Sequence, residues 1–112
     1  HVQRLAYMGG VEGATNILTK IASNLAQIAK ELNIGVVMIS HVNDDGHAKY
    51  AKSLEEEAIM LIKIERDKES TDEEISNTTR FIVTKNRCFS KLGYAGMVYY
   101  DPKTTILQEI KA

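Results

Sequence analysis

Two cations separated by one residue form the first pattern in this sequence that could do chemistry. Lys85 and Arg87 flank Asn86 at the end of an apolar, β-branched segment, residues 79–85, which predicts a strand. Residues two apart on an extended segment point to the same side, so the lysine ammonium and the planar guanidinium could grip one anion together. A solvated turn is the alternative interpretation, because Lys-x-Arg is common in exposed turns.

A histidine that follows an apolar run is the second pattern. Residues 34–40 are nearly all apolar and rich in β-branched side chains, which predicts a strand that a parallel sheet covers on both faces. His41 comes directly after this run. Ligands bind at the carboxyl ends of the strands of a parallel sheet, which makes His41 a candidate binding residue. A histidine without a task in a strand-exit loop is the alternative.

A polar loop that contains Asn43, Gly46, Lys49 and Lys52 is the third pattern. Its lysines could contact the phosphate backbone of a nucleic acid. A solvated connector is the alternative. We expect no metal site, because the chain has one cysteine and its three histidines lack the spacing of a metal-binding motif.

The elements that must position these residues follow from the hydrophobic periodicity. We expect a helix over residues 14–32 that stops at Asn33, because asparagine tolerates the left-handed cap conformation. We also expect a strand over 34–40, a helical turn over 53–58, and strands over 59–66, 79–85, 94–100 and 104–110. The last two strands predict a C-terminal antiparallel hairpin around the turn of residues 101–103. The segment 67–77 reads as a polar loop. The order predicts an α/β chain in which one helix and strand lead into a small antiparallel meander.

Composition narrows the classes of protein to which the chain can belong. The chain has 112 residues, 44 % of them hydrophobic, which suits a packed domain rather than a disordered one. The net charge of −1 argues against a uniformly cationic DNA-coating protein. The charge is divided, however: residues 52–76 contain nine acidic and four basic residues, whereas residues 79–103 contain five basic and one acidic. No apolar run approaches the about 18–20 residues of a membrane-spanning helix.

The machinery for cleaving a nucleotide is missing from the sequence. It contains no GxxxxGK[ST] phosphate loop and no serine nucleophile elbow. At this length, a large enclosed active site together with its scaffold is difficult to accommodate. Because the chain begins with His1 rather than methionine, we expect it to be one piece of a longer protein, a single fragment over residues 1–112.

The three patterns occur in an order that resembles the C-terminal half of the RecA-like motor domain of hexameric replicative DNA helicases. This group includes phage primase-helicases, their mitochondrial relatives and bacterial DnaB-type helicases. The segment NIGVVMISHVNDDG resembles the strand that ends in a sensor residue, with the DNA-binding loop after it. SLEEEAIMLIKIERD resembles the next short helix and strand, and FIVTKNRCFSKLGYAGMVYYDPKTTIL resembles the strand, arginine-finger turn and closing hairpin. The resemblance covers nearly the whole chain and is strongest as an ordered set.

The resemblance implies a partial RecA-like core, of the P-loop NTPase class, that lacks its Walker A half. Arg87 takes the place of the arginine finger that reaches the nucleotide of the neighbouring subunit, and Lys85 that of its companion lysine. His41 takes the place of the sensor of the γ-phosphate. The loop with Asn43, Gly46, Lys49 and Lys52 takes the place of the loop that grips single-stranded DNA.

The activity implied for the parent protein is that of an ATP-dependent DNA helicase. Such a protein uses ATP or dTTP with Mg²⁺ and forms a ring of identical subunits, expected to be a hexamer. It moves along single-stranded DNA, and no membrane partner is expected. Its compartment is the cytoplasm of a bacterial or phage-infected cell, or the mitochondrion for a mitochondrial relative. The chain alone is expected to be inactive and to bind no nucleotide. Two other functions stay open: another RecA-fold ATPase, of recombinase or clock type, and a non-catalytic assembly or nucleic-acid-binding module.

The sequence departs from the family pattern in places. Residues 49–52 (KYAK) stand where the family has Arg-x-Ser-Gly, Cys88 displaces the usual aromatic residue to Phe89, and residues 90–93 (SKLG) replace Gly-Asp-x-Gly. These differences bear on the detailed assignment of the DNA-binding loop more than on the assignment of Arg87 as the arginine finger.

Overall fold

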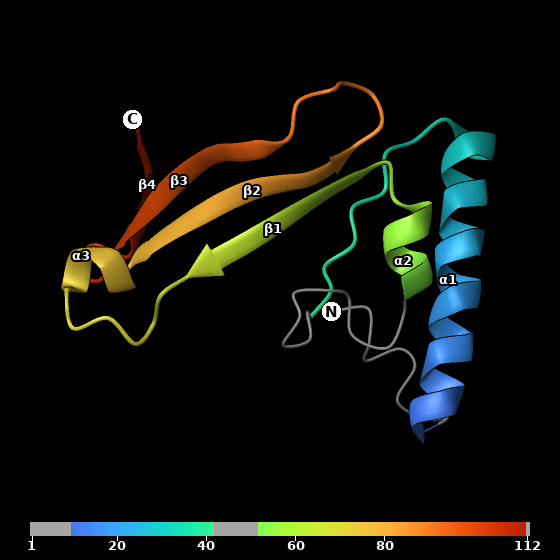
Figure 1. The fold of residues 1–112 in the computed structure, drawn as a ribbon, viewed down its shortest axis with the longest axis horizontal. Helices are drawn as coiled ribbons and strands as arrows, with labels where there is room; N and C mark the ends of the chain where they lie inside the picture. The colour runs from blue at the N-terminus through green and yellow to red at the C-terminus, as the bar shows by residue number, and fades with distance from the viewer. Residues whose placement is uncertain (1–9, 42–51, 112) are drawn as a thin grey trace. The chain divides into compact units, whose positions relative to one another are not determined.

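The computed structural model describes residues 10–41 and 52–111 of the chain, with residues 10–15 described by their backbone alone (Figure 1). It divides into two compact units, residues 1–58 and residues 59–112, which we describe separately. The class is α/β, with three helices and one four-stranded antiparallel sheet in the described residues.

The first unit is built on helix α1, Gly10–Leu32, with the short helix α2, Lys52–Glu57. Apolar residues recur every three or four positions along α1, so they line one face. Leu18 and Ala22 on that face are buried together with Leu54 of α2, and Ile17, Ile21 and Met38 pack around them. This small cluster is the core of the unit.

The carboxyl end of α1 is closed by the residue type that the sequence predicts. Asn33 follows the helix with φ 51°, in the left-handed region that asparagine tolerates. The backbone N–H of Ile34 then donates to the carbonyl oxygen of Ala29 at 3.1 Å. This bond satisfies a carbonyl of the last turn that has no partner within the helix, so Asn33 ends α1 as expected.

The second unit is an antiparallel meander of four strands in the order β1-β2-β3-β4 (Figure 1). The strands are β1, Met60–Arg66; β2, Thr78–Asn86; β3, Gly93–Asp101; and β4, Ile106–Ile110. The predicted strands and the C-terminal hairpin are therefore confirmed to within two residues at each end. The expected loop 67–77 differs, because it contains the short helix α3, Glu73–Ser76, which is capped by the Asp72 side chain.

The strand predicted over residues 34–40 is wrong for this structure. The segment has no regular secondary structure, and it pairs with no strand of the described chain. Its side chains are also not buried as predicted: Val37 is 93 % exposed and Ile39 75 % exposed. The β-branched composition favours an extended backbone, but a strand needs a neighbouring strand to complete its hydrogen bonds, and here it has none.

One face of the sheet is apolar and open. Cross-strand partners share a face of a sheet, and the register pairs Ile62 with Val83 and Ile64 with Phe81. Ile62 is 52 % exposed and Ile64 is 66 % exposed. None of the described residues in β1–β4 is buried. A sheet of this kind normally packs its apolar face against a second layer.

Candidate functional site

The candidate site lies where β2 ends and the chain turns toward β3. Lys85 lies within β2, and Arg87 comes one residue after the strand. The strand pairing continues to Arg87, because its backbone N–H donates to the carbonyl oxygen of Ile59 at 3.0 Å. The main chain of the predicted cation pair is therefore fixed to the start of β1.

A β-bulge precedes the cation pair. The register pairs Val83 with Ile62 and Lys85 with Leu61, so Thr84 is the extra residue on β2. Because Leu61 and Ile62 are adjacent on β1, they point to opposite faces of the sheet. The bulge thus turns Lys85 away from the face of Val83, with which it would share a side in a regular strand. Bulges commonly re-aim side chains next to functional sites.

The side chain of Asn86 organises the turn after β2. Its Oδ1 accepts a hydrogen bond from the backbone N–H of Phe89 at 3.1 Å, and its Nδ2 donates to the carbonyl oxygen of Lys91 at 3.3 Å. Gly93 then opens β3 with φ 101°, a conformation that favours glycine. We call residues 86–92 the finger turn.

The two cations differ in exposure. Lys85 is half-buried at the end of β2, whereas Arg87 is exposed on the finger turn. A tethered main chain with an exposed guanidinium suits the recognition of an anion that comes from outside the chain, because Arg keeps its charge and offers two parallel donors. The pattern predicted from the sequence therefore maps onto one ordered turn.

The other predicted site residues belong to the first unit. His41 is exposed at the end of the irregular segment 34–41, where its carbonyl oxygen accepts a hydrogen bond from Ser40 Oγ at 3.1 Å. Lys52 is the exposed first residue of α2. Asn43, Gly46 and Lys49 lie outside the described residues. Of the predicted residues, the second unit thus brings Lys85 and Arg87 together.

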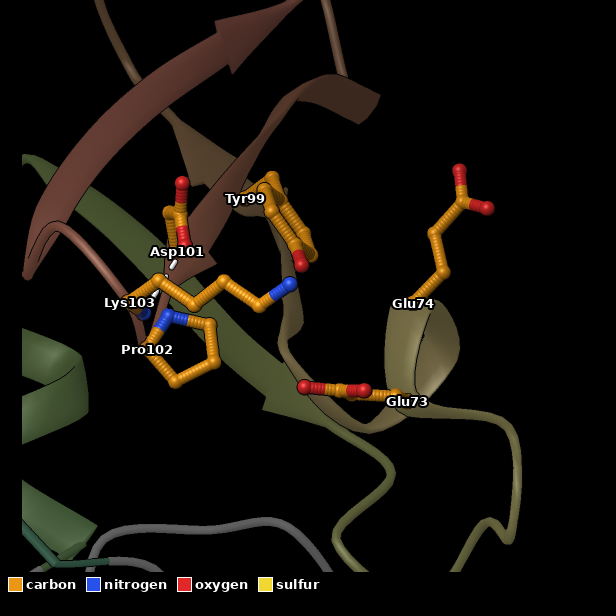
Figure 2. Close-up of a pocket in the computed structure, with 6 residues that line it drawn as sticks. All are labelled: Glu73, Glu74, Tyr99, Asp101, Pro102 and Lys103. Carbon is orange, nitrogen blue, oxygen red and sulfur yellow. Dashed lines mark hydrogen bonds between the residues drawn. The ribbon is translucent and has the colours of Figure 1, made fainter.

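An acidic pocket that the sequence did not predict lies near the opposite end of β2 from the finger turn (Figure 2). Its volume is about 350 Å³, and it is lined by two acidic residues of α3 and by residues of the β3–β4 hairpin: Glu73, Glu74, Tyr99, Asp101, Pro102 and Lys103. These residues are far apart in the sequence, and no local pattern indicates that they meet. Antiparallel pairing of β2 with β3 brings them together, with Thr78 opposite Tyr99.

The electrostatics of this pocket oppose nucleotide binding. Partial burial, and then the nearby carboxylates of Asp101, Glu73 and Glu74, raise the pKa of Tyr99 above its ordinary value. The backbone N–H of Lys103 donates to Asp101 Oδ1 at 2.9 Å, and this bond leads the causes that lower the pKa of Asp101. Three carboxylates and one ammonium, that of Lys103, line the opening, so the net negative charge of the acidic pocket disfavours phosphate.

A charged cluster crosses β1 and β2 on the sheet. Lys63 Nζ lies 2.8 Å from Glu65 Oε1, and an Arg80 guanidinium nitrogen lies 3.6 Å from Glu65 Oε2. The hydrogen bond from Lys63, followed by its charge, lowers the pKa of Glu65. Lys63 and Glu65 both lie on β1, so the partly exposed pair of Glu65 with Arg80 is the one that contributes modestly to the β1–β2 pairing.

The described part of the chain contains neither a cluster of metal ligands nor a helix suited to cross a membrane. No group of three or more His, Cys, Asp or Glu side chains there is arranged to hold a metal ion. None of the described helices combines the length and apolar character that a membrane crossing requires.

Comparison with known proteins does not identify a family for this chain. No protein-family model matches the sequence, and no curated protein matches it.

Proposed function

We propose that this chain is part of the RecA-like motor domain of a ring-forming, NTP-driven DNA helicase. In this proposal Arg87 acts in trans, on the nucleotide held by the neighbouring subunit, and Lys85 assists it. The observation that carries the proposal is the junction of β2 with the finger turn, where a half-buried lysine at the end of the strand is followed by an exposed arginine on a main chain fixed to the residue before β1.

The chemistry of phosphoryl transfer explains why such a turn would matter. Negative charge develops on the γ-phosphoryl oxygens and the leaving oxygen, and catalysis depends on positioning and charge stabilisation. A guanidinium supplied from a neighbouring subunit is typically worth ~10³–10⁵ in rate. An arginine whose main chain is already ordered loses less conformational freedom when it engages the phosphate.

Open apolar surface supports the view that the chain works with further protein. The face of the sheet that carries Ile62 and Ile64 is exposed, and so are Val37 and Ile39 in the segment 34–40. A parallel strand and a covering layer supplied by the rest of a motor domain would bury both surfaces. The same proposal makes the segment 34–40 a strand in the complete domain, with His41 as the sensor at its carboxyl end.

The nucleotide and its Mg²⁺ would be held by other parts of the protein. The sequence has no phosphate loop, and the described residues offer no set of metal ligands. The part proposed for this chain is therefore limited to binding and orienting the phosphates from the opposite side of a subunit interface. On the DNA, Lys52 together with the undescribed Asn43, Gly46 and Lys49 would contact backbone phosphates, as the resemblance implies.

Substitution of Arg87 in the full-length protein tests the proposal. Arg87→Ala should lower the DNA-stimulated kcat for NTP hydrolysis by at least about 10³-fold, while the Kd for nucleotide changes little. The matched control is Lys91→Ala, which removes another exposed cation from the same turn and should leave kcat close to wild type.

Mixed rings test the action in trans. When Arg87→Ala subunits are mixed with subunits whose phosphate loop has been inactivated, hydrolysis should reappear, because a phosphate-loop variant can supply its Arg87 to the intact nucleotide site of an Arg87→Ala neighbour; two defects that act within one subunit would give no recovery. Hydrolysis that survives Arg87→Ala would show that the finger assignment is wrong. Salt-dependent DNA binding that nucleotide never alters would instead favour a non-catalytic nucleic-acid-binding module.

A further inference from the structure

We infer that Asn86 is a positioning residue for Arg87, a role that rests on the proposed function of the finger turn. Asn86 stands between the two cations and its side chain spans the turn. We do not assign Asn86 a contact with a phosphate or a reacting atom. It acts by holding the main chain from which Arg87 projects.

The hydrogen bonds of the Asn86 side chain join the main chain before Arg87 to the main chain after it. The acceptor Oδ1 is bonded to the N–H of Phe89, and the donor Nδ2 is bonded to the carbonyl oxygen of Lys91, so both bonds reach across Arg87. The backbone N–H of Arg87 also donates a hydrogen bond to the carbonyl oxygen of Ile59. A residue with one acceptor and one donor on the same short side chain is needed for this pattern, and asparagine provides both.

Apolar packing does little to order the turn. Phe89 is 71 % exposed and Leu92 is 65 % exposed, so apolar packing contributes little to the conformation of residues 87–92. The two side chain–backbone bonds of Asn86 therefore contribute to the order of the turn. Each such bond is worth a modest factor, and the loss of both corresponds to about a 5- to 30-fold smaller ratio of ordered to disordered turn.

The sheet provides a closely matched control residue. Asn77 immediately precedes β2, as Asn86 ends it, and it too is half-buried. It also uses both amide atoms: Nδ2 donates to the carbonyl oxygen of Glu73 at 2.9 Å, and Oδ1 accepts from an Arg66 guanidinium nitrogen at 3.2 Å. Asn77→Ala therefore also removes two hydrogen bonds made by an asparagine amide, one to a backbone carbonyl and one from a guanidinium, at the end of β2 away from Arg87.

The experiment compares Asn86→Ala, Asn86→Ser and Asn77→Ala in the full-length protein. Asn86→Ala should lower kcat for DNA-stimulated hydrolysis by about 5- to 30-fold with KM within about twofold. Asn86→Ser should recover part of the loss, because a serine hydroxyl can accept the bond from Phe89 N–H. Asn77→Ala should leave kcat near wild type even where thermal unfolding shows a loss of stability like that of Asn86→Ala. Equal losses of kcat in the two alanine variants would overturn the inference, since a general structural effect would then explain both.

Amide hydrogen exchange examines the same role without any hydrolysis. Peptides covering residues 87–92 should exchange about fivefold faster or more in Asn86→Ala and unchanged in Asn77→Ala. Unaltered exchange and unaltered kcat in Asn86→Ala, beside a large loss in Arg87→Ala, would refute the inference and leave the proposed function standing. Normal hydrolysis in Arg87→Ala would refute the proposed function itself, and with it the catalytic meaning of Asn86.

Discussion

Truncation of Val37 tests whether the segment 34–40 is an incomplete strand. Val37→Ala removes the equivalent of two methylene groups. Their transfer from water to a fully buried position is worth about 1.6 kcal/mol. Val37 is 93 % exposed, so only about a tenth of this value is at stake in the 112-residue chain, or ~0.1–0.2 kcal/mol. If the remainder of a motor domain covers the segment, the same substitution should cost about 1.5–2.5 kcal/mol in the full-length protein, since a small cavity adds to the transfer term.

Urea denaturation of the 112-residue chain, followed by circular dichroism, and native-state hydrogen exchange of the full-length protein measure the two costs. Leu18→Ala is the control, because Leu18 is fully buried and its truncation should cost about 2–5 kcal/mol in both settings. A cost of more than about 0.5 kcal/mol for Val37→Ala in the chain alone would contradict the exposure described here. A cost that stays near zero in the full-length protein would refute the proposal that a further layer covers this segment.

Substitutions at two further positions test local features of the fold. Asn33→Gly should preserve or slightly raise the stability of α1, because glycine tolerates positive φ. Asn33→Val should lower the stability by about 1–2 kcal/mol, because a β-branched residue resists the positive φ at this position. Equal thermal unfolding temperatures of the two variants would contradict the left-handed cap. Glu65→Gln should lower the urea midpoint at pH 7, and the difference from wild type should shrink steadily as the pH is lowered below 4.5. The pKa of Glu65 is lowered in the folded chain from 4.5, so its stabilising contribution is present above that value and is lost as the pH falls through the folded pKa. A difference that persists in acid would show that the ion pairs with Lys63 and Arg80 are not its cause.

The elements that depend on neighbouring residues were predictable from the sequence. The period of the apolar residues predicted α1, and the left-handed tendency of Asn33 predicted its end. The alternation of β1 and the turn at residues 101–103 predicted the meander, because antiparallel strands joined by short turns need only local contacts. The cation pair was also visible as a local pattern, with Lys85 on β2 and Arg87 after it.

Tertiary structure decided what depends on pairing between distant segments. The bulge at Thr84, which redirects Lys85, follows from the register of β1 against β2 and has no mark in the local sequence. The acidic pocket exists because β2 and β3 bring Tyr99 and Asp101 close to α3.

The segment 34–40 shows the same division between sequence and structure most directly. Its β-branched residues dictate an extended tendency, but burial and strand formation depend on a partner strand that the described chain does not supply. Local preferences are set by each residue and its near neighbours, whereas hydrogen bonding between strands and exclusion of water require surfaces that only the assembled fold provides.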